Sequence, residues 1–233
     1  MKLFFITYAG GSASFFNILA AELASDFECI LIEYAGHASR RRTPFYNSFK
    51  EMVNDVSQII TEHLDKDELF SIFGYSMGSL VAYEALVGSI KRGRCVHLFV
   101  AAHFPPDASE LRKKYSKMTD EELSREMEQF GGLDARIVAN KRFLNIYLSV
   151  IRKDYQLLEE YVFNGVKKMV PCKITVFYSE EDTEYAIMRG WQEYTQDEVA
   201  FIQYHGNHFF LKKQEKAVAD DIRKALSCNS SNI

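Results

Sequence analysis

The stretch Leu69-Phe70-Ser71-Ile72-Phe73-Gly74-Tyr75-Ser76-Met77-Gly78 decides the fold of this chain. Its first five residues predict a buried β-strand, and residues 77–89 have the apolar periodicity of a helix. The Gly-x-Ser-x-Gly pattern between them predicts a tight strand-to-helix turn that exposes Ser76 as a nucleophile. We expect glycine to be required at positions 74 and 78, because a side chain there would clash with its neighbours. A glycine turn with an incidental serine is the simpler alternative.

Short β-branched and aromatic runs alternate with helical segments on both sides of this turn. The alternation is typical of β-α-β units and predicts the α/β class, with a mostly parallel central sheet flanked by helices. We predict strands at residues 2–7, 27–33, 69–73, 96–101, 173–178 and 199–204 and helices at residues 15–24, 48–64, 77–89 and 214–226. A short signal peptide is the alternative for the first of these strands.

Residues 105–168 interrupt this rhythm with a helical, charge-rich insertion. Thr119-Asp120-Glu121-Glu122 is a capping box, so a helix should begin there and end at Gly131-Gly132. A longer helix should follow, and its apolar stripe consists of Leu144, Tyr147, Leu148, Ile151, Tyr155, Leu158 and Val162. The two stripes either extend the core or form a lid over a substrate pocket. We expect one domain over residues 1–233 with a lid insertion at about residues 105–168.

Composition limits the partners of the chain. The 28 basic and 32 acidic side chains among 233 residues give a net charge of −4, which disfavours nucleic acid and anionic membranes as ligands. No apolar run approaches the roughly 20 residues that span a bilayer. The scattered Cys29, Cys95, Cys172 and Cys228 form no metal-binding pattern, and they suggest a reducing cytoplasm. We therefore expect a cytoplasmic monomer without a metal or cofactor.

A serine nucleophile needs a general base and an orienting carboxylate, which follow it in the order Asp or Glu, then His, in this type of fold. Asp182 follows a predicted strand, and His208 follows the last one, so both should lie with Ser76 at the carboxyl ends of parallel strands. Glu181 is the substitute for Asp182. The competing histidines are His37, His63 in a predicted helix, His97 in a predicted strand, His103, and His205 at the end of the last strand.

The oxyanion of a tetrahedral intermediate needs two preorganised N–H donors. The amide of Met77, directly after the nucleophile, should be one of them. The loop after the first strand, Tyr8-Ala9-Gly10-Gly11, should supply the other, from Ala9 or else from Gly10. An ordinary glycine-rich turn is the alternative for this loop.

With these residues in place, the chain resembles the discrete type II thioesterases of nonribosomal peptide and polyketide synthetases, which belong to the α/β-hydrolase superfamily. The motifs that carry the resemblance are Tyr8-Ala9-Gly10-Gly11-Ser12-Ala13, Tyr34-Ala35-Gly36-His37, Gly74-Tyr75-Ser76-Met77-Gly78, Asp120-Glu121-Glu122-Leu123 with Gly131-Gly132, Asp154-Tyr155 with Leu158-Glu159, and Gly206-Asn207-His208-Phe209-Phe210. The resemblance implies hydrolysis of unwanted short acyl or aminoacyl groups from the phosphopantetheine arm of acyl or peptidyl carrier proteins, in antibiotic biosynthesis. It also implies Ser76, Asp182 and His208 as the catalytic residues, with Met77 and Ala9 as oxyanion donors.

Three positions depart from the family pattern. Tyr75 stands where the turn often has His, Ser79 stands where Gly or Ala is usual, and Tyr34-Ala35 replaces a frequent Pro-Gly. None of these departures removes a catalytic group. A general carboxylesterase, a chain-terminating acyl-carrier-protein thioesterase and an inactive binding module on the same fold are the alternative functions.

Arg40-Arg41-Arg42 is the densest basic run of this acidic chain. It follows the second predicted strand, on the same edge of the sheet as Ser76. It could meet the acidic surface or the phosphate of a carrier protein. A solvated basic loop is the simpler interpretation.

Overall fold

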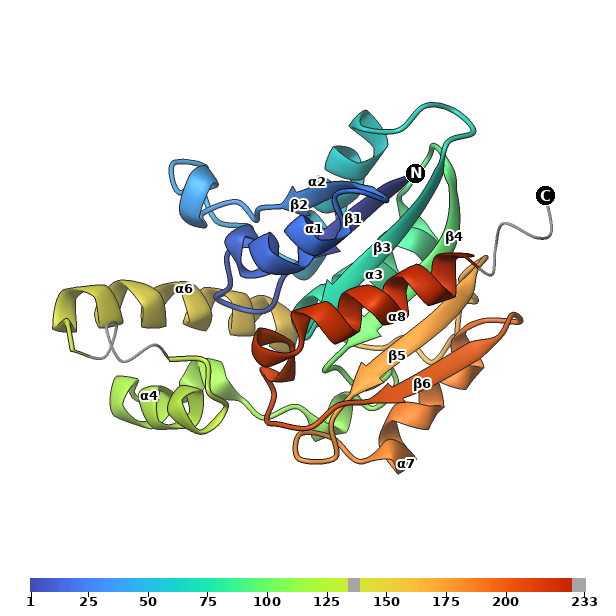
Figure 1. The fold of residues 1–233 in the computed structure, drawn as a ribbon. Helices are drawn as coiled ribbons and strands as arrows, with labels where there is room; N and C mark the ends of the chain where they lie inside the picture. The colour runs from blue at the N-terminus through green and yellow to red at the C-terminus, as the bar shows by residue number, and fades with distance from the viewer. Residues whose placement is uncertain (134–138, 228–233) are drawn as a thin grey trace.

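The computed structural model describes residues 1–133 and 139–227. Within this part of the chain, six parallel strands form one sheet in the order β2-β1-β3-β4-β5-β6 (Figure 1). The strands are β1 (Lys2–Ile6), β2 (Glu28–Ile32), β3 (Leu69–Tyr75), β4 (Arg94–Ala101), β5 (Lys173–Tyr178) and β6 (Val199–Gln203). All six predicted strands are confirmed. β3 is two residues longer than predicted, because Gly74 and Tyr75 still pair with Val100 and Ala101 of β4.

Helices cover both faces of the sheet (Figure 1). They are α1 (Asn17–Leu23), α2 (Phe49–Glu62), α3 (Met77–Gly88), α4 (Asp120–Gln129), α6 (Lys141–Glu160), α7 (Tyr185–Met188) and α8 (Glu215–Ser227). Side chains of β1 alternate between the two faces, as a strand requires. Leu3 and Phe5 join the apolar cluster under α1 and α8, whereas Phe4 and Ile6 join the cluster under α2 and α3. A strand buried on both faces explains the continuous apolar runs of the sequence.

The strand order places the loops after β1 and β3 side by side. After β2 pairs on one side of β1, the chain crosses to its other side, where β3 lies. The loops that follow β1 and β3 therefore leave the same end of adjacent strands. In open parallel sheets this reversal of direction is where ligands bind.

In the described part of the insertion lie the helices α4 and α6, with the predicted capping box at the start of the first. The Thr119 hydroxyl accepts a bond from Glu122 N at 3.3 Å, and the Glu122 carboxylate accepts one from Thr119 N at 2.8 Å. Gly131 adopts a φ of +75°, which suits a helix stop. The predicted stripe of α6 is wrong at its end: the helix stops at Glu160, and Val162 is 79% exposed.

The two apolar stripes of the insertion pack in different places. Tyr115, Leu123, Met127, Leu148 and Ile151 form a small apolar cluster of their own between α4 and α6. Leu157 and Leu158, at the end of α6, instead join the main core beside α2 and α3. Among the described residues, no helix is long and apolar enough to cross a membrane.

Candidate active site

Ser76 occupies a strained turn between β3 and α3. Its backbone has φ 51° and ψ −123°, a conformation that non-glycine residues adopt at a cost of about 1–3 kcal/mol. A backbone hydrogen bond to the end of β4 fixes the turn, because Ser76 N donates to Ala101 O at 2.7 Å. A Cβ atom on Gly78 would lie 2.1 Å from Ile6 O, and one on Gly74 would lie 2.5 Å from Gly78 O. Both glycines are therefore required where the sequence predicted them.

His208 links Ser76 to Asp182. Its Nε2 lies 3.0 Å from Ser76 Oγ, and its Nδ1 lies 2.9 Å from Asp182 Oδ1. The structure thus brings together the three predicted catalytic side chains, which come from the loops after β3, β5 and β6. Glu181, the alternative acid, instead accepts a bond from Gly206 N at 2.8 Å and so supports the histidine loop.

The loop that carries His208 is fixed from two sides. The buried Tyr75 hydroxyl donates to His208 O at 2.7 Å, and burial raises the pKa of this phenol well above its usual value. From the insertion, the ring of Phe130 lies 5.3 Å from the His208 ring. Gly131 approaches so closely that a Cβ there would meet Asn207 Nδ2 at 2.5 Å. The insertion therefore packs directly on the histidine loop.

The two predicted oxyanion donors flank Ser76. Met77 is the first residue of α3, so its N–H is one of the helix N-terminal groups that lack an intrahelical acceptor. In the loop after β1, Gly11 N donates to Tyr8 O at 2.9 Å and Gly10 N donates to Asp154 Oδ2 at 2.6 Å. Among the described residues no acceptor occupies the Ala9 amide. Of the two candidates in this loop, Ala9 rather than Gly10 has a free N–H.

A cavity of about 460 Å³ opens beside Ser76 and His208. Its walls combine the insertion with the loops after β4 and β5, and they include Tyr115, Phe130, Tyr155, Leu158, His103, Phe104, Thr183 and Ile187. Aromatic and aliphatic side chains form part of the wall, as is typical of small-molecule sites, and the charged Arg112, Lys113, Glu159 and Glu184 also line it. Its volume lies in the range of small-molecule sites.

His103 is the buried histidine of this cavity. Its Nδ1 lies 2.5 Å from Phe104 O, which can only accept, so Nδ1 carries the proton. Burial, together with the nearby Arg112 charge, lowers the pKa of His103 to about 3. The ring is therefore neutral in the cavity wall, and it is His208 rather than His103 whose ring nitrogen bonds Ser76 Oγ.

The other histidines lie elsewhere. The prediction that His63 lies in a helix is wrong by one residue, because α2 stops at Glu62 and His63 follows it. His97 in β4 bonds Thr175 Oγ1 at 2.8 Å. The prediction that His205 ends the last strand is wrong, because β6 stops at Gln203 and His205 lies in the loop beyond it. His37 is buried and pairs with Asp154. The sequence analysis did not predict this pair, although both residues lie in motifs of the family resemblance.

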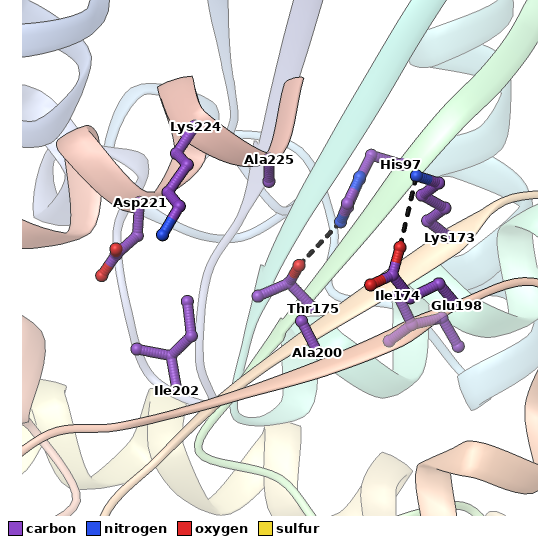
Figure 2. A pocket seen from close by; sticks show the side chains of 10 residues that line it. All are labelled: His97, Lys173, Ile174, Thr175, Glu198, Ala200, Ile202, Asp221, Lys224 and Ala225. Carbon is purple, nitrogen blue, oxygen red and sulfur yellow. Dashed lines mark hydrogen bonds and ion pairs between the residues drawn. The ribbon is translucent and has the colours of Figure 1, made fainter. Parts of the chain in front are cut away.

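A second cavity, of about 280 Å³, lies between α8 and the strands β5 and β6 (Figure 2). His97, Thr175 and Lys224 line it. The predicted catalytic side chains, Ser76, Asp182 and His208, do not line this cavity. In the described part of the chain, no group of three or more His, Cys, Asp or Glu side chains could hold a metal ion.

The parallel sheet, the strained serine turn and the order of the three side chains define an α/β-hydrolase-like protein. A family model described as Thioesterase domain matches residues 1–226, so the chain belongs to this thioesterase family.

Three comparisons specify the relationship. The chain is 26% identical over 231 residues to the gramicidin S biosynthesis protein GrsT of Aneurinibacillus migulanus, covering 97% of this chain and 89% of that protein. It is 26% identical over 230 residues to a probable cadicidin biosynthesis thioesterase of Streptomyces griseus, covering 97% of this chain but only 62% of that relative. The structure of the type II thioesterase BorB from the borrelidin biosynthetic cluster has the same fold, with a TM-score of 0.85, 24% identity and coverage of 97% and 92%. The resemblance to type II thioesterases is confirmed.

Proposed function

We propose that this protein is a serine thioesterase that removes aberrant or short acyl and aminoacyl groups from the phosphopantetheine arm of carrier proteins. The observation that carries the proposal is the hydrogen-bonded chain Ser76–His208–Asp182 beside a cavity with partly aromatic and aliphatic walls, in a member of the thioesterase family. The relatives of nonribosomal peptide and polyketide pathways support carrier proteins as partners. In this proposal the reaction takes place in the cytoplasm, where the nonribosomal peptide and polyketide synthetases carry these acyl groups.

The reaction has two acyl-transfer steps. His208 Nε2 takes the Ser76 hydroxyl proton while Oγ attacks the thioester carbonyl, and the resulting oxyanion accepts bonds from Met77 N–H and Ala9 N–H. The carbon–sulfur bond breaks, and the pantetheine sulfur leaves with the proton from His208. Water then attacks the acyl-serine as His208 takes its proton, and Ser76 Oγ recovers a proton as the acid is released. Asp182 holds the imidazole tautomer and stabilises the imidazolium.

The insertion acts as a lid in this proposal. Phe130 and Tyr155 lie in the cavity wall beside His208, where they would exclude water from the acyl chain. Because water must still reach the acyl-serine in the second step, the wall cannot seal the site completely.

The test compares an acetyl carrier protein, acetyl-pantetheine and p-nitrophenyl acetate as substrates of the wild type and of Ser76→Ala. We expect Ser76-dependent hydrolysis with the highest kcat/KM for the carrier-bound thioester. Equal or greater activity on the free esters would indicate a general esterase, and a preference for long acyl carriers would indicate a chain-terminating enzyme. Ser76→Ala with normal turnover would refute the mechanism, and a wild type inert to a fluorophosphonate would indicate a binding module.

A further inference from the structure

Asp154 connects the insertion to the loop after β1. It lies on α6 and is only 1% exposed, although it carries a charge. Its Oδ2 accepts a bond from Gly10 N at 2.6 Å and another from His37 Nε2 at 2.9 Å. Burying an unpaired carboxylate is strongly unfavourable, so these bonds are needed for the residue to stay inside the protein.

The partner ring of His37 is bonded at both nitrogens. Nδ1 lies 3.0 Å from Ala35 O, which can only accept, while Nε2 faces the Asp154 carboxylate. Donating both bonds requires the imidazolium form. Burial opposes this charge, but the bond and charge of Asp154, with help from Glu33, raise the pKa of His37 overall. Among the described residues, the Tyr34 phenol also faces the ring, and burial raises its pKa well above its usual value.

Packing of α6 against the loop after β1 also holds this loop in place. Ile151 lies one turn before Asp154 on α6, and a Cβ on Gly10 would come within 2.1 Å of its side chain. Gly10 has a φ of +77°, so glycine satisfies both the backbone conformation and the close approach of the helix. The helix therefore contacts the loop through a side chain and holds it through a hydrogen bond.

We infer that Asp154 is a positioning residue, which with the His37 imidazolium fixes residues 8–11 so that the Ala9 N–H faces the reacting carbonyl. The inference rests on the proposed function, because it takes the Ala9 N–H as an oxyanion donor. By occupying Gly10 N–H, Asp154 also selects which amide of the loop remains free. The insertion thus contributes to the active site by orienting a backbone donor as well as by covering the cavity.

The test measures kcat and KM for Asp154→Asn with the carrier-bound thioester. The variant keeps the shape of the side chain but removes the charge that holds His37 protonated. Loss of an oxyanion donor costs about 10²–10³ in kcat, so we expect a displaced donor to lower kcat by about tenfold or more with little change in KM. His37→Gln should give the same pattern, and it serves as the second variant if Asp154→Asn does not fold.

Asp120→Asn is the matched control. It removes an exposed ion pair between α4 and Arg152 of α6, which is 2.6 Å long, without touching residues 8–11. We expect nearly wild-type kcat from this variant. Equal losses in Asp120→Asn and Asp154→Asn would overturn the inference, because general loosening of the insertion would then explain both. Wild-type kcat in Asp154→Asn would also overturn it.

The pH profile separates positioning from a merely structural role. Wild-type kcat should fall as the pH rises through the raised pKa of His37, because the neutral ring loses one of its two bonds. In Asp154→Asn this alkaline limb should move to lower pH, and an unmoved limb would contradict the inference. The rate at which a fluorophosphonate labels Ser76 also depends on the oxyanion donors. If Asp154→Asn slows this labelling while the wild type does not hydrolyse carrier-bound thioesters, the inference about Asp154 stands and the proposed substrate class is wrong.

Discussion

Gly78→Ala should destabilise the protein by disrupting a close approach of α3 to β1. The new Cβ would lie 2.1 Å from Ile6 O and 2.6 Å from Thr7 O. Ordinary C···O contacts are about 3.3–3.6 Å, so α3 and β1 must separate by about 1 Å. Ile6 O is held because β1 is paired with β2 on one side and β3 on the other, and Thr7 O accepts a bond from the Tyr34 hydroxyl at 2.9 Å. Overpacking against a fixed backbone should cost at least about 3 kcal/mol in the free energy of unfolding.

Thermal unfolding measures this effect. For a chain of this size about 3 kcal/mol corresponds to a fall in Tm of about 6–12 °C. Gly88→Ala is the matched control, since it lies on the same helix with nothing within 4 Å of the new Cβ, and we expect unchanged or slightly higher stability. Gly78→Ala should also lower kcat, because displaced Thr7 carries the loop with Ala9. A Tm of Gly78→Ala within about 1 °C of the wild type would refute this reasoning.

The remaining predictions concern acid stability, the histidine loop and the carrier. His97 has an ordinary pKa of 6.5 when unfolded, and burial lowers its pKa to about 4 in the folded state. The free energy of unfolding should therefore fall as the pH drops from 6.5 towards 4. Urea unfolding at pH 7.5 and at pH 5 measures this fall, and we expect it to be about 2 kcal/mol smaller in His97→Asn than in the wild type. Tyr75→Phe leaves the His208 carbonyl without its donor and should cost about 1–2 kcal/mol in urea unfolding and lower kcat. Arg41→Glu combined with Arg42→Glu should raise KM for the carrier-bound thioester at low salt but not for acetyl-pantetheine, and an unchanged KM would exclude docking there.

The basic run that motivates this last prediction is not uniform in the structure. Arg40 makes two bonds to the Asp55 carboxylate, at 2.6 and 3.0 Å, and Tyr46 donates to the same carboxylate at 2.5 Å. This bidentate pair fixes the loop after β2, so Arg40 has a structural role of its own. Arg41 and Arg42 are exposed, and they are the residues of the run that a carrier protein could reach.

The sequence predicted the sheet and the three hydrogen-bonded side chains because both depend on local patterns. Apolar runs mark the strands, and a reactive side chain directly after a parallel strand lies at the same edge as the others. The choice of Asp182 over Glu181 was harder, since neighbouring residues in a loop differ only in where their side chains point. The end of α6 was mispredicted, because Val162 continues the apolar periodicity beyond the point where the helix stops.

The Asp154–His37–Gly10 contacts could not be predicted in this way. They join residues 117 and 144 positions apart in the chain, and no short motif encodes such a pairing. A buried charge on an otherwise apolar helix face was the available signal, since Asp154 falls beside Ile151 and Tyr155 in the stripe of α6. A carboxylate on such a face needs a buried partner of opposite charge. The same contacts decide between Ala9 and Gly10 as the free donor, which periodicity alone left open.

The three departures from the family pattern share one physical effect. The Tyr34 hydroxyl donates to Thr7 O at 2.9 Å, at the start of the loop with Ala9. The Tyr75 hydroxyl holds the carbonyl of His208, and Ser79 Oγ lies 2.8 Å from Gly74 O below the serine turn. None of the three lines the cavity beside Ser76. Each departure therefore adds a hydrogen bond to a loop that carries the reactive groups. These substitutions affect how rigidly the site is held rather than the shape of the cavity that receives the acyl chain.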